Sequence, residues 1–171
     1  MEKYYSTRNT NDRVSFSTGV TRGLSPDAGL YVPESFTNID IYDEKYLKMS
    51  YQELAVDILS NFLDGYTKEE VTTFVSEAYG DNFETKDIVP VKTCDKVNFL
   101  ELFRGPTLAF KDMALQILPK FMVAAARKEG ITDEIVVLTA TSGDTGKAAL
   151  EGFANKEGEA DSGSYRTKNR I

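Results

Sequence analysis

The sequence contains no histidine and only one cysteine among its 171 residues. Without histidine the chain cannot form a Ser-His-Asp or Cys-His catalytic site, so any general base must be Lys, Asp, Glu or Tyr. A zinc site would need carboxylates and a single thiol, and the sequence shows no such cluster. Cys94 has no partner for an internal disulfide, which favours a reducing, cytoplasmic location.

Positive charge and long apolar runs are also scarce. The net charge is −7, and an acidic surface repels phosphate backbones, which argues against a nucleic-acid partner. No apolar run is long enough to span a membrane, and the first residues lack the basic start and apolar stretch of a signal peptide. Apolar residues make up 41% of the chain and charged residues 27%, as in an ordinary globular domain with its own core.

Two amphipathic helices are predicted near the middle of the chain. Ser50 and Thr67 each begin a capping box, with a glutamate three residues later and a glycine past the end of the apolar pattern. We therefore predict helices over 51–63 and 68–79. Their apolar spacing predicts that six side chains face inward: Leu54, Ile58, Phe62, Val71, Phe74 and Val75.

The remaining elements predict an α/β fold. Residues 1–35 have the composition of an ordered loop with short extended pieces, and the segments 88–91 and 97–102 are typical of short strands that could form a hairpin. A helix is expected over 112–129, with Pro119 kinking it or lying in its first turns. The apolar segment 135–139 is typical of a buried strand in a parallel sheet, and a helix is expected to follow the next glycine-containing turn.

Two turns could carry chemistry. The turn at 142–146 follows the apolar segment and opens a helix, where unpaired backbone amides attract a carboxylate or phosphate; alternatively, Ser142 or Asp144 simply caps that helix. Lys111 lies at the start of the other predicted helix, where the macrodipole disfavours a positive charge. That position suits a lysine that acts as a neutral nucleophile, although a solvated surface lysine is the ordinary alternative.

Taken together, three segments resemble one family. Residues 105–112 (GPTLAFKD) are similar to the segment of the threonine synthases that contains the cofactor lysine, and residues 139–146 (TATSGDTG) to their substrate-carboxylate loop. Residues 29–33 (GLYVP) resemble an N-terminal segment of the same family. Related fold type II enzymes that use pyridoxal 5'-phosphate (PLP) usually carry Asn where this chain has Asp144, so Asp144 favours threonine synthase.

The resemblance implies a cofactor, a substrate and a set of site residues. The family uses PLP to convert O-phospho-L-homoserine and water into L-threonine and phosphate. By resemblance, Lys111 would hold PLP as a Schiff base and would then move protons on the substrate. Ser142, Gly143 and Thr145 would bind the substrate carboxylate, and Asp144 would lie near the ring hydroxyl of PLP.

The resemblance also divides the chain. Residues 1–90 would be the N-terminal threonine synthase region, residues 91–155 the start of the PLP-binding domain with its parallel sheet incomplete, and residues 156–171 a polar tail that is disordered or non-native. Family members are much longer, and their PLP-phosphate loop lies downstream. We therefore expect the chain to be inactive alone and to self-associate through an exposed sheet edge. A non-catalytic remnant of the family and a plain anion-binding α/β module are the alternatives.

Overall fold

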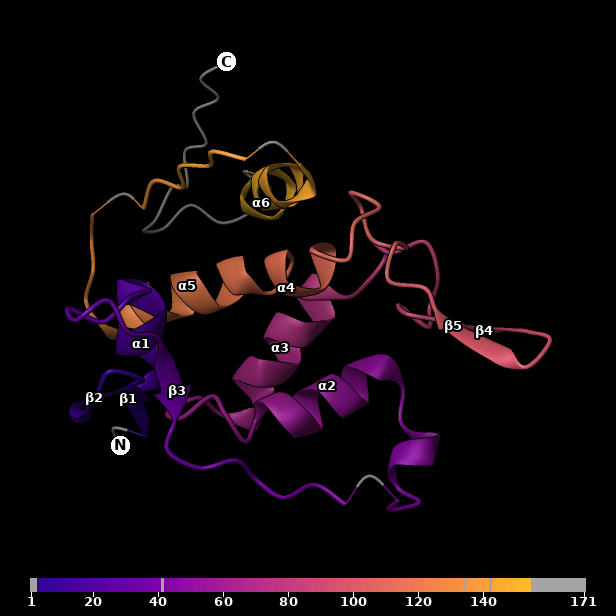
Figure 1. Cartoon of the computed structure of the whole chain (residues 1–171), viewed down its shortest axis with the longest axis horizontal. Coiled ribbons are helices and arrows are strands. Elements are labelled where there is room, and N and C mark those ends of the chain that lie inside the picture. The colour runs from indigo at the N-terminus through magenta and orange to yellow at the C-terminus, as the bar shows by residue number, and fades with distance from the viewer. Residues whose placement is uncertain (1–2, 41, 134, 142, 155–171) are drawn as a thin grey trace.

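The structure is a computed structural model that describes residues 3–40, 42–133, 135–141 and 143–154. The tail expected at 156–171 therefore lies outside the described residues. Two antiparallel sheets and several helices make up the described chain, which confirms the α/β class (Figure 1). Among the described elements, no helix is both long enough and apolar enough to cross a membrane.

The first 35 residues contain more regular structure than their composition predicts. A small antiparallel sheet has the order β2-β1-β3 and is built from β1 (Tyr4–Ser6), β2 (Asn9–Val14) and β3 (Tyr31–Pro33). Helix α1 (Phe16–Arg22) follows β2 and begins at Ser15, whose side chain accepts a hydrogen bond from the Thr18 N–H at 3.0 Å. The strands were predicted only as short extended pieces because β1 and β3 pair across 25 residues, which a local pattern cannot reveal.

The two capping boxes form as predicted. They open helix α2 (Tyr51–Leu59) and helix α3 (Lys68–Ala78). In each box the side chain of the cap residue accepts a hydrogen bond from the backbone N–H of the glutamate, and the glutamate side chain accepts one from the backbone N–H of the cap residue. A short 3₁₀ turn, η1 (Tyr46–Lys48), precedes α2. Both helices end sooner than predicted, α2 by four residues.

The predicted buried face is confirmed for α3, whereas α2 buries a different set of residues from the predicted one. Val71 and Val75 are buried, and Phe74 packs against the core. Of the predicted residues, Leu54 and Ile58 on α2 and Phe62 just past it are only half-buried. The buried core positions lie on a neighbouring stripe, at Val56 and, just past the helix, Leu63, and Ala55 and Leu59 pack against them. Helical spacing allows either stripe, and the contact with α3 determines which one is buried.

An aromatic cluster joins the N-terminal region to the rest of the chain. Phe16 of α1 makes edge-to-face contacts with Tyr66 and Phe121, at ring-centre distances of 5.8 and 5.6 Å. Phe74 of α3 also contacts Phe121, at 5.9 Å. Phe121 belongs to helix α5, so α1, α3 and α5 share one core.

The predicted hairpin is present and projects from the body of the molecule (Figure 1). It consists of β4 (Val91–Cys94) and β5 (Val97–Leu100), with Asp95 in the turn at a φ of 53°. The first strand lies three residues later than the predicted 88–91, because Ile88 is instead buried in the core. All eight strand residues are exposed.

The C-terminal half of the described chain is helical. The helix predicted over 112–129 is divided into α4 (Asp112–Leu115) and α5 (Leu118–Lys128), with Pro119 in the first turn of α5 as expected. Helix α6 (Asp144–Phe153) lies over α4 and α5 (Figure 1).

The buried parallel strand predicted at 135–139 is wrong for the described structure. These residues form no strand there and alternate between half-buried and exposed, with Leu138 83% exposed. Such an apolar run needs a neighbouring strand on its hydrogen-bonding edge, and the described residues supply none.

Candidate functional site

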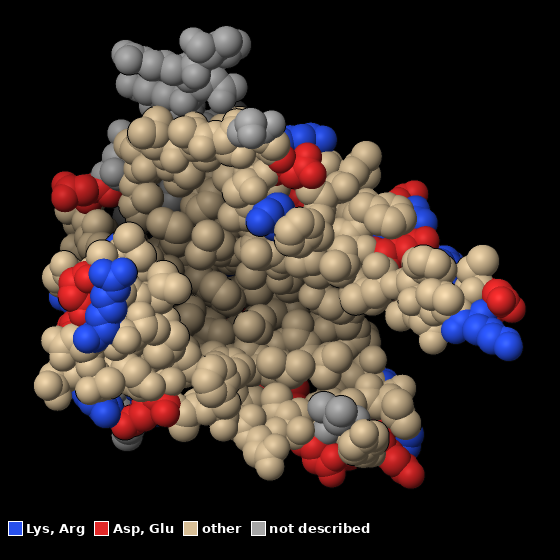
Figure 2. All heavy atoms as spheres, viewed as in Figure 1, with Lys and Arg blue, Asp and Glu red and all other residues tan. Residues whose placement is uncertain are grey.

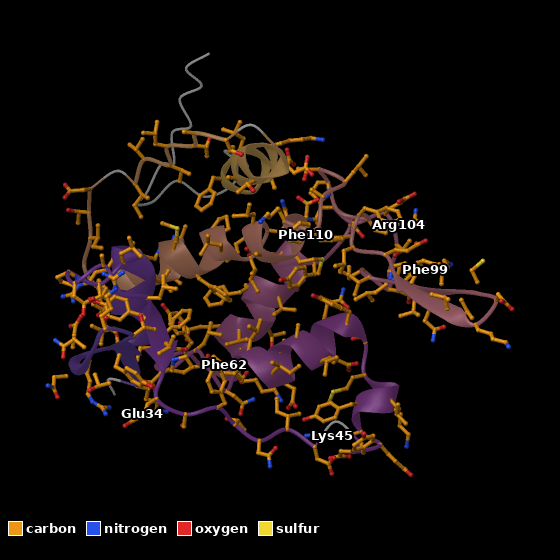
Figure 3. The ribbon with its side chains drawn as sticks, viewed as in Figure 1. Glu34, Lys45, Phe62, Phe99, Arg104 and Phe110 are labelled. Carbon is orange, nitrogen blue, oxygen red and sulfur yellow. The ribbon has the colours of Figure 1, made fainter. Side chains whose placement is uncertain are left out.

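Lys111 lies at the start of α4, as the sequence predicts. Its backbone is the N-cap of that helix, and its side chain is half-buried. The Lys111 Nζ lies 4.7 Å from the centre of the Phe110 ring, which is itself exposed near the start of α4 (Figure 3). Among the described residues no carboxylate pairs with Lys111.

The loop before Lys111 is closed by the residue after it. The Asp112 side chain is fully buried, and it accepts hydrogen bonds from the Thr107 N–H at 2.9 Å and from the Thr107 hydroxyl at 2.6 Å. Gly105 permits this closure, because a Cβ there would lie 2.5 Å from Asp112 Oδ2. The sequence order Gly-Pro-Thr before Lys-Asp thus has a physical basis in one compact turn.

Two side chains fix α4 from beneath. The Tyr79 hydroxyl donates to the Met113 carbonyl at 2.6 Å, and the Asn82 amide donates to Gln116 Oε1 at 3.0 Å. Burial raises the pKa of Tyr79 well above its ordinary value, so the hydroxyl keeps the proton that it donates. The backbone that carries Lys111 is therefore anchored to the end of α3.

The second predicted turn opens α6. Gly143 is the N-cap, and no side chain of a described residue caps the helix there. The alternative in which Asp144 caps this helix therefore does not hold, because Asp144 is the first helical residue. Asp144 and Thr145 are exposed, together with Gly143. Ser142, the other proposed cap and carboxylate ligand, lies outside the described residues.

Gly146 packs within the first turn of α6. A Cβ on Gly146 would lie 2.2 Å from Thr141 Cγ2, and the Thr141 hydroxyl accepts a hydrogen bond from the Gly143 N–H at 3.2 Å. The chain before α6 therefore folds closely over the helix start. This leaves the backbone of 143–145 at the surface, as an anion-binding turn requires.

The structure links the two turns directly. The Lys147 Nζ donates to the Thr107 carbonyl at 3.0 Å, across 40 residues of sequence. Helix α6 also packs closely on α4, since a Cβ on Gly152 would lie 2.0 Å from the Leu115 carbonyl oxygen. Sequence reasoning did not identify Lys147, whose signal is a lysine in the first turn of a helix, where its charge is unfavourable.

The site residues offer groups that suit a carbonyl-bearing anionic cofactor. No group of three or more His, Cys, Asp or Glu residues that could hold a metal ion occurs in the part of the chain that the structure describes. Within the described residues, Lys111 offers an amine without an ion pair, and the start of α6 offers backbone amides without a side-chain cap. An amine and an uncapped helix start are groups of the kind that can hold PLP.

Comparison with known proteins identifies the class. Residues 3–79 match the family model of the threonine synthase N terminus. Together with the relatives and structures below, which span most of the chain, this match shows that the chain belongs to the threonine synthase family and corresponds to its N-terminal part.

The chain is most informatively compared with particular threonine synthases. It is 37% identical over 166 residues to that of Methylobacillus glycogenes, covering 91% of this chain and 34% of the relative, and 36% identical over 153 residues to that of Pseudomonas aeruginosa, covering 88% and 32%. The PLP-bound threonine synthase of Brucella melitensis superposes with a TM-score of 0.82 at 35% identity, covering 98% of this chain and 35% of that one. The chain thus spans about a third of the length of these relatives.

Proposed function

We propose that this chain supplies the cofactor-lysine portion of a PLP-dependent threonine synthase, which converts O-phospho-L-homoserine and water into L-threonine and phosphate. The observation that carries the proposal is the link between Lys111 and the start of α6 through Thr107 and Lys147. It ties the two segments that resemble the family's cofactor and substrate segments. Membership in the family and the PLP bound to the Brucella melitensis relative support the same assignment.

Each site residue has a proposed role. Lys111 would hold the cofactor, and its freed amine would move protons on the substrate, since the histidine-free chain has no imidazole for that task. When bound, PLP supplies an electron sink for carbanion chemistry. Gly143 and Thr145, with Ser142, would bind the substrate carboxylate at the start of α6. Asp144 would lie near the cofactor ring hydroxyl.

The two alternatives differ in what Lys111 does. A non-catalytic remnant of the family would bind PLP at Lys111 without turnover, whereas a plain anion-binding module would bind phosphate at 143–145 and leave Lys111 unmodified.

We further propose that the chain is divided into an N-terminal region (1–90), the start of the PLP-binding domain (91–155) and a polar tail (156–171). Its first two parts share a core through α3 and α5.

The surface suggests how the chain associates. Charged side chains gather along the rim of the face in Figure 2, and much of its centre is uncharged. The projecting hairpin exposes Val91, Val97, Phe99 and Leu100 and has two free strand edges. We propose that copies of the chain self-associate through this hairpin.

The exposed, unpaired thiol of Cys94 on the same hairpin favours a cytoplasmic location.

A covalent trapping experiment tests the cofactor assignment. The chain is incubated with PLP, reduced with borohydride and digested, and the modified lysines are identified by mass spectrometry. We expect the label to concentrate on Lys111 and to vanish from that peptide in Lys111→Ala, while Lys120→Ala leaves it unchanged. Uniform labelling of exposed lysines without preference for Lys111 would reject the assignment and leave the anion-binding alternative.

A further inference from the structure

The strongest unassigned contact joins the first turn of α6 to the lysine loop. Lys147 is the fourth residue of α6, and its Nζ lies 3.0 Å from the Thr107 carbonyl oxygen. A lysine in the first turn is disfavoured by the helix macrodipole. An ammonium group donating to a carbonyl is a charge-assisted hydrogen bond, which is stronger than a neutral one. Its long side chain therefore has a specific partner and does not simply extend into solvent.

Thr107 is held from two sides. Its N–H and hydroxyl donate to Asp112, the residue that follows Lys111, and its carbonyl accepts from Lys147. Thr107 is itself buried. Because Asp112 is the first residue of α4, any displacement of Thr107 is transmitted to the backbone at Lys111. Lys147 therefore acts on Lys111 through two intervening residues.

A second contact prevents α6 from pivoting about the first. Gly152 lies against the Leu115 carbonyl so closely that a Cβ would approach its oxygen to 2.0 Å. Gly152 lies five positions after Lys147 in the helix, or about 7.5 Å along the axis at 1.5 Å per residue. Contacts at two points along α6 fix its direction as well as its position relative to α4. The turn at 143–145 is thereby held at one place relative to Lys111.

We propose that Lys147 is a positioning residue, which sets the cofactor lysine and the substrate-carboxylate turn in register through the Thr107 carbonyl. The proposal rests on the function proposed above, because it concerns how those two segments work together. It predicts that loss of the Lys147 ammonium loosens the lysine loop and lowers the share of Lys111 that forms a reducible bond with PLP. In this proposal Lys147 acts only through the Thr107 carbonyl and takes no part in the chemistry itself.

Three variants test the proposal in the full chain. Lys147→Met keeps the length of the side chain but removes the donor, Lys147→Arg keeps a charged donor, and Glu151→Gln alters an exposed charge on the same helix. Each is titrated with PLP, and borohydride-trapped label on Lys111 is measured. From the strength of one charge-assisted hydrogen bond at a partly exposed site, we expect Lys147→Met to raise the PLP concentration for half-labelling about fivefold. Lys147→Arg should recover most of the loss, and Glu151→Gln should match the parent chain.

Hydrogen exchange separates this proposal from the assignment of function. In Lys147→Met, the Thr107 amide should exchange faster while amides of α3 remain protected, which also shows that the variant is folded. If the parent chain labels Lys111 and Lys147→Met labels it equally well, the positioning role is overturned and the cofactor assignment stands. If the parent chain does not label Lys111, the cofactor assignment fails. In that case the positioning role is tested by hydrogen exchange alone. If the Thr107 amide is as protected in Lys147→Met as in the parent chain, the positioning role is overturned.

Discussion

Asp112 and Thr107 form a closed pair within the loop that carries the candidate cofactor lysine. The fully buried Asp112 carboxylate accepts from both the N–H and the hydroxyl of Thr107, at 2.9 and 2.6 Å. The residue next to Lys111 therefore shapes the loop and is not available to pair with its amine. The pair also explains why glycine stands at position 105, where any side chain would collide with Asp112.

Removing the Asp112 acceptors should destabilise the fold. Asp112→Ala leaves the buried Thr107 N–H without a partner, and we expect a loss of about 1–3 kcal/mol in the free energy of unfolding. Asp112→Asn should cost clearly less, since the amide can accept from the N–H and donate to the hydroxyl. Urea denaturation of both variants measures the difference. Equal losses would contradict the geometry of the pair.

Helix α6 should depend on glycine at position 152. Gly152→Ala places a methyl group 2.0 Å from the Leu115 carbonyl oxygen, so α6 must move away from α4. We expect a loss of about 1–3 kcal/mol from this overpacking. The matched control is Gly19→Ala in α1, where a Cβ would meet neighbours at 3.6–3.7 Å and should be neutral or stabilising by up to about 1 kcal/mol. The temperature of thermal unfolding should therefore fall for Gly152→Ala and stay the same or rise for Gly19→Ala, and equal decreases in both would contradict the packing of α6 on α4.

The N-terminal sheet should weaken in acid through Asp27. Hydrogen bonds from the buried Ser6 hydroxyl, at 2.8 and 3.0 Å, and from the Gly29 N–H, at 2.8 Å, hold the pKa of Asp27 below its ordinary value. Because the folded-state pKa is the lower one, this contribution is fully present above the unfolded value of about 3.9. It is lost as the pH falls through the lowered pKa.

Carboxyl NMR titration of the folded chain measures that pKa directly. The free energy of unfolding should rise less between acid and neutral pH in Asp27→Asn than in the parent chain. Asp81→Asn, at an exposed position, should keep the parent's pH dependence. A titration midpoint for Asp27 at or above the ordinary value would contradict the hydrogen bonds around it.

Self-association should depend on the hairpin. Phe99 is 54% exposed on β5, so Phe99→Lys places a charge among the exposed apolar residues of the hairpin at no cost to the core. We expect the variant to shift toward monomer in light scattering coupled to size exclusion. Lys96→Gln, in the hairpin turn, changes a charge without altering an apolar strand residue and should change the mass less. Monomer at all concentrations in the parent chain would refute hairpin-mediated association.

Local signals predicted some parts of this molecule well. The capping boxes at Ser50 and Thr67 determine where α2 and α3 begin, and Pro119 marks the first turn of α5. Lys111 lies at a helix start for the same reason, since its loop and helix are encoded by adjacent residues. Such features depend on neighbours within a few positions, which a single sequence displays.

Features that depend on distant partners were not predictable. The stripe of α2 that becomes buried is chosen by α3, and the pairing of β1 with β3 joins segments 25 residues apart. The apolar segment 135–139 has the composition of a strand but no partner strand among the described residues. The Lys147 contact with Thr107 spans 40 residues, and only the arrangement of α4 and α6 brings it about.

The most direct test of the account measures turnover that depends on Lys111. The 171-residue chain by itself should release no phosphate from O-phospho-L-homoserine, because turnover needs cofactor and substrate held in fixed register. The measurement therefore uses a chimera in which residues 1–154 replace the matching N-terminal third of the Methylobacillus glycogenes threonine synthase. We expect the chimera to release phosphate with PLP present, Lys111→Ala to abolish the release, and Lys120→Ala to retain it. An active chimera whose rate survives Lys111→Ala would contradict the central claim that Lys111 is the cofactor lysine.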